Sequence, residues 1–535
     1  MKTASAEILK EVAKRRTFAI ISHPDAGKTT VTEKLLLFGN AIQMAGVVKA
    51  KKAKMFATSD WMEIEKQRGI SVASSVMQFT YNKTEFNLLD TPGHQDFSED
   101  TYRVLTAVDS ALMVIDSAKG IETQTKKLFQ VCRDRNIPIA TFINKWDRPS
   151  KDAFELLDEI EKTLNLRCAV ATWPIGESDR FVGVYDLLHN QVRLFEGGKK
   201  TLDFKTQIFD NLDDPLLLQS VGEERLQKLQ EDLELLHSGH SYSKEEFLQG
   251  QVSPVFFGSA INNFGMQELL QHLTTDAPAP LSRPAKSRLV APSEAPFTGV
   301  VFKIQANMDP KHRDRCAFLR ICSGVYTPGM ATHHVRLDRP YKIHNAMQFM
   351  SQSRENVDQA VAGDIIGIND RGNLKIGDTL TEGENLEFTG IPQFSPDMFS
   401  LVELKTPLKM KQLQKGLEQL AEEGTSQLFR RKYNSDAIIG VVGTLQFEVV
   451  KFRLLNEYGA DASFTHLPYT CSRWYRCDIK KSLEDFESYF QTQVVFDAHA
   501  YPMMLFKDDW ELKYISGKYP DVKFYSSLLA YEKDL

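Results

Sequence analysis

Residues 22–30 read Ser22-His23-Pro24-Asp25-Ala26-Gly27-Lys28-Thr29-Thr30, and they stand between a short apolar run, Phe18 to Ile21, and a helical pattern. A strand, a loop of this composition and a helix form the context that a phosphate-binding loop requires. Backbone N–H groups of such a loop, together with the helix N-terminus, attract phosphate oxygens. Lys28 is expected to neutralise charge on the β- and γ-phosphates, and the Thr29 hydroxyl to coordinate Mg²⁺. Ser22 replaces the first glycine of the common pattern, and a chance glycine-lysine turn is the alternative for this segment alone.

Short apolar runs in the first half of the chain alternate with helical patterns, which predicts an α/β domain with a doubly wound, mostly parallel sheet. The predicted strands are Phe18 to Ile21, Phe86 to Leu89, Ala111 to Ile115, Ile139 to Ile143 and Val255 to Phe257. The first, second, fourth and fifth of them run directly into polar or glycine-rich segments. Because ligands of open α/β sheets lie outside the carboxyl ends of the strands, these segments are expected to form one site.

The second predicted strand leads into Asp90-Thr91-Pro92-Gly93-His94. An acidic residue at a strand end can hold Mg²⁺ through water, as a Walker-B aspartate does. The Gly93 N–H can approach the γ-phosphate because the residue has no side chain. His94 is placed to orient the attacking water, although a histidine after glycine is by itself more often a plain surface residue. The catalytic role of His94 therefore depends on the surrounding motif.

The fourth predicted strand ends in Asn144-Lys145-Trp146-Asp147. A carboxylate there can accept hydrogen bonds from the N1 and N2 donors of guanine, whereas adenine lacks that pair. Discrimination can be large because a mismatched base leaves a buried carboxylate unpaired. Alone this pattern is common in solvated turns, but after the two preceding motifs it predicts GTP or GDP as the ligand. Gly258-Ser259-Ala260 ends the fifth strand and is expected to offer backbone N–H groups to guanine O6.

The rest of the chain predicts two further domains. A charged helical stretch at about 151–251 is too long for a crossover and is interpreted as a subdomain inserted in a GTP-binding domain, residues 1–282. Prolines from Pro278 to Pro296 mark a linker. Short strands separated by glycine turns then predict a β-barrel domain at 292–388, and mixed helices and strands predict an α+β domain at 395–535.

The composition excludes several classes of protein. With 42% apolar and 25% charged residues the chain is typical of globular proteins, and no long uncharged apolar stretch occurs. The charged pattern near Met1 leads us to expect no signal sequence. We expect a cytoplasmic protein without membrane contact. Six cysteines without a C-x-x-C pair indicate reduced, structural thiols rather than zinc or disulfides. The net charge of −6 restricts any RNA contact to part of the surface.

The motifs together, in this order, resemble the GTPase domain of the translational GTPases, a family that includes elongation factor G. Asp60-Trp61-Met62-Glu63-Ile64-Glu65-Lys66-Gln67-Arg68-Gly69-Ile70-Ser71 is similar to the family's first switch segment. Ser71 replaces the usual threonine, and its hydroxyl or carbonyl is expected to approach Mg²⁺ and the γ-phosphate. By motif position, Ile70 and Pro24 would form the family's hydrophobic gate beside the catalytic histidine.

The resemblance extends over nearly the whole chain. Segments similar to elongation factor G stand in the inserted subdomain (Trp173 to Gly176, Phe181 to Leu187), the second domain (Ala362 to Ile365, Ile376 to Leu380) and the third domain (Gly416 to Gly424, Gly443 to Val449). The further domains of elongation factor G are not expected here. This layout resembles the termination branch of the family.

The resemblance implies a ribosome-stimulated GTPase that promotes dissociation of codon-reading release factors after peptide release and hydrolyses GTP to leave. The implied cofactors are GTP or GDP and Mg²⁺, and the implied partners of this monomer are ribosomal RNA and proteins and the release factors. The catalytic residues would be His94, Lys28 and Gly93, and the metal would be held by Thr29, Ser71 and, through water, Asp90. The nucleotide would contact Ser22, His23, Pro24, Asp25, Ala26, Gly27, Lys28, Thr29, Thr30, Ser71, Asp90, Thr91, Pro92, Gly93, His94, Asn144, Lys145, Asp147, Ser259 and Ala260.

Two alternatives stay open. One is a translocating or ribosome-rescuing GTPase of the same family, and the other is a GTP-binding scaffold or assembly factor that hardly hydrolyses its nucleotide. His94 argues against the scaffold, because a pure binder needs no water-orienting residue. The basic residues Arg430, Arg431 and Lys432 and the segment Arg473-Trp474-Tyr475-Arg476 can contact ribosomal RNA or simply lie on a solvated face.

Overall fold

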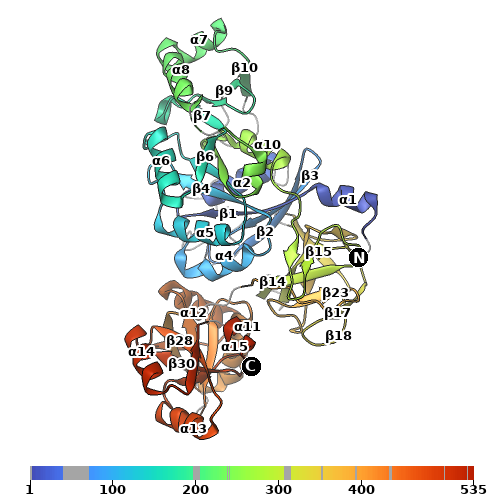
Figure 1. The fold of residues 1–535 in the computed structure, drawn as a ribbon, viewed down its shortest axis with the longest axis vertical. Helices are drawn as coiled ribbons and strands as arrows, with labels where there is room; N and C mark the ends of the chain where they lie inside the picture. The colour runs from blue at the N-terminus through green and yellow to red at the C-terminus, as the bar shows by residue number, and fades with distance from the viewer. Residues whose placement is uncertain are drawn as a thin grey trace.

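The computed structural model describes residues 3–39, 65, 71–196, 205–237, 239, 241–306, 315–350, 353–391, 395–432, 436–498, 500–526 and 528–534. A mixed, mostly parallel α/β domain comes first along the chain, an antiparallel β domain second and an α+β domain third (Figure 1). The α/β and α+β domains lie at opposite ends of the molecule, and the β domain lies beside both. None of the helices in the described ranges is long and apolar enough to cross a membrane.

The sheet of the first domain has the order β2-β3-β1-β4-β5-β11-β6 within the described ranges. All its neighbouring strands are parallel except β2, which is antiparallel to β3. All five predicted strands are present, whereas β2 and β6 were not predicted. The strands are β1 Arg15–Ser22, β2 Ser75–Tyr81, β3 Thr84–Asp90, β4 Ser110–Asp116, β5 Ile139–Asn144, β6 Arg167–Val170 and β11 Val252–Phe257.

Helices cover both faces of this sheet, because alternate side chains of a strand point to opposite faces. Phe18 and Ile20 of β1 pack with one layer, which includes α2 and α10, and Ala19 and Ile21 pack with the other, which includes α5 and α6. The helices of this domain are α1 Ala6–Ala13, α2 Lys28–Phe38, α4 Ser98–Val104, α5 Thr123–Asp134, α6 Ala153–Leu164, α9 Lys244–Leu248 and α10 Met266–Thr275, with short η1 Gln95–Phe97 and η3 Ala260–Asn262.

The inserted subdomain is a small antiparallel sheet, in the order β10-β9-β8-β7, with helices against it. It lies at the end of the molecule opposite to the C-terminal domain (Figure 1). The predicted range 151–251 also contains α6 and β6, and β6 pairs with β11 of the main sheet. The elements of the subdomain are β7 Thr172–Ile175, η2 Ser178–Arg180, β8 Gly183–Asp186, β9 Gln191–Glu196, β10 Lys205–Phe209, α7 Pro215–Val221 and α8 Glu223–His237.

The second domain is antiparallel throughout its main sheet, whose order is β18-β17-β23-β14-β15-β22-β19-β20. An apolar core of alternating strand residues fills it, including Val301, Leu319 and Ile366. Its strands are β12 Arg283–Pro284, β13 Leu289–Val290, β14 Thr298–Ala306, β15 Arg315–Ser323, β16 Val325–Tyr326, β17 Ala331–His334, β18 Arg339–Lys342, β19 Ala346–Met350, β20 Ser353–Asn356, β21 Ala360–Val361, β22 Ile365–Asn369 and β23 Thr379–Thr381.

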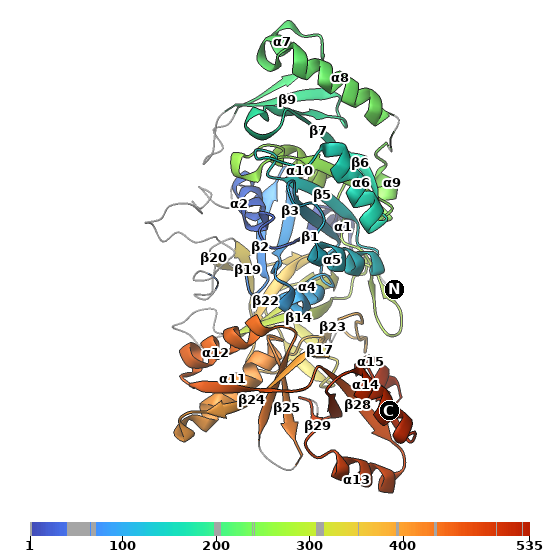
Figure 2. The same cartoon turned by 90° about the vertical axis from the view of Figure 1, so that its left-hand side faces the viewer.

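The third domain has a sheet of order β27-β24-β26-β25-β29-β30-β28-β31. Helices α11 and α12 pack at one end of it and α13 to α15 at the other (Figure 2). The predicted helix Lys409 to Glu423 and strand Ile438 to Val442 match α11 and β26. The elements are β24 Met398–Leu404, η4 Pro407–Lys409, α11 Met410–Glu422, β25 Gln427–Arg431, β26 Ala437–Val441, α12 Thr444–Tyr458, β27 Ala462–Leu467, β28 Cys471–Cys477, α13 Lys480–Tyr489, β29 Val494–Phe496, β30 Pro502–Phe506, α14 Asp509–Lys518, β31 Val522–Tyr525 and α15 Leu528–Lys533.

Candidate functional site

The loop between β1 and α2 adopts a backbone that few residues tolerate. Asp25 and Gly27 have positive φ angles of 67° and 94°. A Cβ on Gly27 would lie 2.3 Å from Asn144 Nδ2, so glycine is required for space as well as for conformation. No described side chain caps the N-terminus of α2, whose first N–H groups therefore suit an anion.

Lys28 and Asp90 form a buried ion pair at the centre of the site. Lys28 is the first residue of α2 and Asp90 the last residue of β3, so the fold joins the two predicted motifs. The second oxygen of Asp90, Oδ2, is buried and has no hydrogen-bond partner among the described residues. A buried carboxylate oxygen without a donor fits the predicted approach of a hydrated Mg²⁺.

Asn144, at the end of β5, connects the phosphate loop to the loop after β11. Its Nδ2 donates to Ala26 O at 2.9 Å, and its Oδ1 accepts from the N–H of Ala260 at 2.9 Å. The next residue, Lys145, donates from Nζ to Asp25 O and to Asp116 Oδ2, the latter at 2.7 Å. These bonds hold the loops predicted to bind the base and the phosphates in one unit.

Asp147 has a carboxylate oxygen, Oδ1, that is buried and has no hydrogen-bond partner in the part of the chain that the structure describes. The preceding Trp146 fixes the loop: its Nε1 donates to Gly176 O at 3.0 Å, and its ring meets Phe257 edge-on at 5.0 Å. The donors of a guanine ring would supply the hydrogen bond that this carboxylate oxygen of Asp147 lacks.

In the loop after β11, the N–H groups predicted to bind guanine O6 already donate to protein acceptors. The N–H of Ser259 donates to Phe264 O at 3.0 Å, and the N–H of Ala260 donates to Asn144. Ser259 Oγ accepts from Asn262 Nδ2 at 3.1 Å. Since both N–H groups already have protein acceptors, donation to guanine O6 would require a shared or exchanged bond, and this role stays a prediction.

Gly93 and His94 follow β3 and lie against the phosphate loop. A Cβ on Gly93 would lie 3.3 Å from Pro24 N, which shows how closely the two backbones approach. His94 caps η1: its Nδ1 accepts from the N–H of Asp96 at 3.2 Å, and its side chain is 36% exposed. A partly exposed imidazole on this loop is accessible to water and to a partner surface.

The metal contacts predicted for Thr29 and Ser71 have less support. Thr29 lies in the first turn of α2 and is half-buried. Ser71 begins a described stretch, and just after it the N–H of Val72 donates to Glu65 Oε1 at 2.8 Å. Of the first switch segment, residues 60–64 and 66–70 lie outside the described residues, and with them the predicted gate residue Ile70.

Two acidic residues of the site were not predicted. Asp116, at the end of β4, holds Lys145; burial raises the pKa of its carboxyl, but the hydrogen bonds from Lys145 and from the Ala118 N–H outweigh burial and leave the pKa below its ordinary value. Glu122 lies 3.0 Å from His23 Nε2, and burial lowers the pKa of His23. A carboxylate at the end of the third predicted strand was the available signal for Asp116.

Three family models match consecutive parts of the chain: the elongation factor Tu GTP binding domain at 13–279, elongation factor G domain 2 at 296–383, and the C-terminal domain of class II release factor RF3 at 388–516. A crystal structure of a Thermus thermophilus protein aligns with a TM-score of 0.69 over 87% of this chain and 71% of that chain. Its sequence identity is 22%, so this likeness concerns the fold alone. With a GTP-binding domain, its nucleotide loops and the release-factor C-terminal domain in order, the chain belongs to the translational GTPases, in the family of class II release factor 3.

Proposed function

We propose that this GTP-binding protein is a ribosome-stimulated GTPase of translation termination. It would promote dissociation of codon-reading release factors after peptide release and leave when it has hydrolysed GTP. The observation that carries the termination role is the match of residues 388–516 to the class II release factor C-terminal domain. The same match favours termination over translocation, the alternative within the family.

Different residues of the site would bind the phosphates, the base and the metal and orient the water, as GTP hydrolysis requires. Lys28 and the first N–H groups of α2 would hold the phosphates, and Asp147 would hold the base. Mg²⁺, held by Thr29, Ser71 and, through water, Asp90, would offset negative charge on the phosphates. His94 would orient the attacking water, so the chemistry depends on positioning and electrostatics.

Slow hydrolysis without the ribosome is part of the proposal. His94 is the N-cap of the short η1 turn and its side chain is 36% exposed, so a partner surface can contact it and fix its position. A histidine whose final position depends on the partner would couple GTP consumption to ribosome binding. We therefore expect the ribosome to be the activator of hydrolysis, and the cytoplasm to be the place of action.

RNA contact through the basic residues of the third domain stays a prediction. Arg430 pairs with Glu418 at 2.8 Å, Lys432 with Glu487 at 2.5 Å, and Arg476 with Asp478 at 2.9 Å. A ribosomal phosphate would have to compete with these carboxylates for the same guanidinium and ammonium groups. The third domain would meet the ribosome as part of a monomeric protein.

The proposal is tested with a fluorescent codon-reading release factor bound to ribosomes that have released their peptide at a stop codon. Addition of the wild-type protein with GTP should speed dissociation of the labelled factor at least about tenfold, while GDP should not. Lys28→Ala, which removes the phosphate-binding ammonium, serves as the inactive control. A dissociation rate that is the same with and without the protein would contradict the termination role.

A further inference from the structure

We propose that Asp96 is a positioning residue for His94 and that helix α12 of the third domain fixes Asp96. The inference rests on the proposed function, because it takes His94 as the residue that orients water. It adds a specific connection: docking of the third domain would set the place of the catalytic imidazole. Several contacts that meet at Asp96 support this connection.

The first contact joins Asp96 to the imidazole. The Asp96 N–H donates to His94 Nδ1 at 3.2 Å, and Asp96 Oδ1 lies 3.3 Å from the same nitrogen. Asp96 is 5% exposed, so water competes little for its carboxylate. The backbone donor suits a neutral ring, and the carboxylate suits a protonated ring. Asp96 therefore restricts the orientation of His94 in either state.

The second contact joins Asp96 to the third domain. Its Oδ2 accepts from the N–H of Leu445 at 2.8 Å, in the first turn of α12. A carboxylate at a helix N-terminus also interacts favourably with the helix dipole. The two oxygens of one buried carboxylate thus face different partners, His94 on one side and α12 on the other.

Gly443, just before α12, makes this approach possible. A Cβ there would lie 2.0 Å from Asp96 Cγ. Its φ of −148° is extended backbone that any residue can adopt, so space and not conformation requires the glycine. The close approach is therefore specific to this pair of residues.

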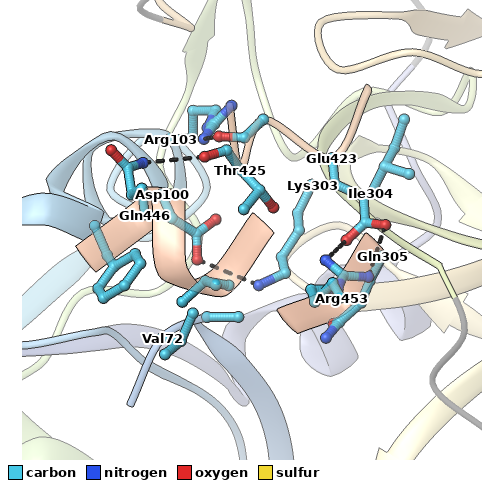
Figure 3. Close-up of a pocket in the computed structure, with 14 residues that line it drawn as sticks. Val72, Asp100, Arg103, Lys303, Ile304, Gln305, Glu423, Thr425, Gln446 and Arg453 are labelled. Atoms are coloured by element: carbon cyan, nitrogen blue, oxygen red, sulfur yellow. Dashed lines mark hydrogen bonds and ion pairs between the residues drawn. The ribbon is translucent and has the colours of Figure 1, made fainter. Parts of the chain in front are cut away.

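Neighbouring contacts hold the segment that carries Asp96 against two other domains. Phe97 packs with Val72 and with Val449 of α12. Figure 3 shows Lys303 of β14 pointing toward Asp100, at 3.3 Å, and Arg103 beside the third domain, where it donates to Gly424 O at 2.9 Å. A shift of the third domain would act on η1 and α4 together. Asp96 contacts His94 Nδ1, and Phe97 also meets His94, through its N–H to His94 O at 3.1 Å and through a ring contact at 6.2 Å between centroids.

The test compares single-turnover GTP hydrolysis at saturating ribosome concentration for Asp96→Ala, Asp96→Asn and Gly443→Ala. Asp96→Ala and Gly443→Ala should lower the rate constant about 10- to 100-fold, as expected for a misplaced catalytic group, with GTP affinity unchanged. Asp96→Asn should lose less, because its amide oxygen can still accept from Leu445. Gly517→Ala, which meets nothing within 4 Å, and Asp461→Asn, an exposed partner of Lys405, are matched controls expected to behave as wild type.

A second readout does not depend on hydrolysis. In the nucleotide-free protein, hydrogen exchange of the Leu445 amide should be faster in Asp96→Ala than in wild type and in Gly517→Ala. Because Asp96→Ala and Gly443→Ala disturb one contact, the double variant should hydrolyse GTP no more slowly than the worse single variant. Unchanged exchange at Leu445, or an additive double variant, would overturn the link to α12.

His94→Ala separates the two proposals. If His94→Ala loses ribosome-stimulated hydrolysis but Asp96→Ala stays within twofold of wild type, the positioning role of Asp96 is wrong and the proposed function is kept. If His94→Ala itself hydrolyses GTP normally, the proposed role of His94 fails, and this inference fails with it. If Asp96→Asn falls as far as Asp96→Ala, the bond from Leu445 plays no part, and the connection through α12 is wrong.

Discussion

Two polar atoms of the predicted nucleotide site lack hydrogen-bond partners in the part of the chain that the structure describes. Asp147 Oδ1 and Asp90 Oδ2 are buried and have no hydrogen-bond partner among the described residues. A buried acceptor without a donor is unfavourable, so both atoms indicate a ligand that supplies donors or positive charge. The sequence motifs had singled out both residues for the same roles.

Asp147→Asn should weaken GTP binding about 100-fold or more, because the asparagine amide would face the guanine donors with a donor of its own. Xanthosine triphosphate, which has an oxygen where guanine has its amino group, should bind the variant better than GTP. Titration with fluorescent nucleotides measures both affinities, with Asp461→Asn as the surface control. Equal GTP affinity in wild type and Asp147→Asn would contradict base recognition by Asp147.

The sequence predicted the residues inside the motifs, but not the residues that hold the motifs in place. Three such residues contact groups far away in the sequence: Asp116 pairs with Lys145, Glu122 lies beside His23, and Asp96 accepts from the Leu445 N–H. For a carboxylate outside a motif, the neighbouring sequence does not show which group it contacts, because contacts between distant parts of the chain decide which carboxylates are buried. Such supporting residues become visible only in the folded chain.

Buried ion pairs connect secondary-structure elements in the third domain. Arg453 of α12 is 1% exposed and pairs with Glu423, just after α11, at 2.7 Å. Burial raises the pKa of Glu423 above its ordinary value even beside Arg453. Removal of the guanidinium would therefore leave a buried carboxyl without its main partner.

Arg453→Met should destabilise the third domain by about 3–5 kcal/mol, because it leaves Glu423 uncompensated. The double variant Arg453→Met with Glu423→Gln should recover most of the loss. Arg430→Met is the matched control: its pair with Glu418 is about half exposed on both sides, and the expected change is about 0–1 kcal/mol. Hydrogen exchange of α11 and α12 amides measures these free energies, and a double variant no better than the single would refute the pairing argument.

A carboxylate of the second domain gives a pH-dependent contribution to stability. Asp378 is buried, and burial raises the pKa of its carboxyl, but hydrogen bonds from Arg336 and the Lys375 N–H, together with the contact of His334 Nε2 at 3.0 Å, outweigh burial and hold the pKa below its ordinary value of 3.8. The folded pKa is the lower one, so the contribution is complete above the unfolded pKa and is lost as the pH falls through the folded pKa.

The difference in melting temperature between wild type and Asp378→Asn should therefore be largest above about pH 5 and should shrink toward pH 2, because the unfolded carboxyl titrates near about 3.9. Asp338→Asn is the matched control, since Asp338 is 88% exposed in its contact with His333. A wild-type advantage that grows on acidification would contradict the assigned direction of the pKa.

Elements with a uniform apolar pattern were predictable, and elements whose partners lie in another domain were not. Strand β2 contains Gln78, which is buried. Its amide donates to Asn87 Oδ1 at 2.6 Å and to Ile365 O of the second domain at 3.0 Å, and these bonds replace the water that the amide has lost. A polar residue in a buried strand contradicts the expected pattern unless the neighbouring domain is known. By contrast, the amphipathic pattern of α11 needed only its own residues.

Buried charged residues of the second domain contact the first domain. Arg320 of β15 is 2% exposed and contacts Asp109 at 2.5 Å and Thr17 Oγ1 at 2.6 Å in the first domain. Lys303 of β14 reaches Ser74 Oγ at 2.7 Å and Asp100. The order of domains could be predicted from the sequence, but this docking could not, because a lone arginine or lysine in a strand is normally solvated.

Lys303→Met should loosen the contact between the second domain and the segments at 71–76 and 98–104 while GTP affinity stays unchanged. The reason is that the partly buried Asp100 would lose the Lys303 ammonium and, among the described residues, would keep its hydrogen bonds from Ser74. Hydrogen exchange of these segments should become at least about tenfold faster, which corresponds to about 1.4 kcal/mol. Lys286→Met, which breaks an exposed pair with Glu387, should change neither quantity. Wild-type exchange rates in Lys303→Met would show that other contacts hold the interface.

In the proposed function, His94 couples GTP hydrolysis by this protein to the ribosome. The most direct measurement is the rate of GTP hydrolysis with and without ribosomes, for wild type and for His94→Ala, at equal nucleotide occupancy. This coupling predicts slow hydrolysis by both proteins alone, acceleration of the wild type by ribosomes of at least about 100-fold, within the range of positioned acid-base groups, and little acceleration of His94→Ala. Equal rates with and without ribosomes, or a fully active His94→Ala, would contradict it.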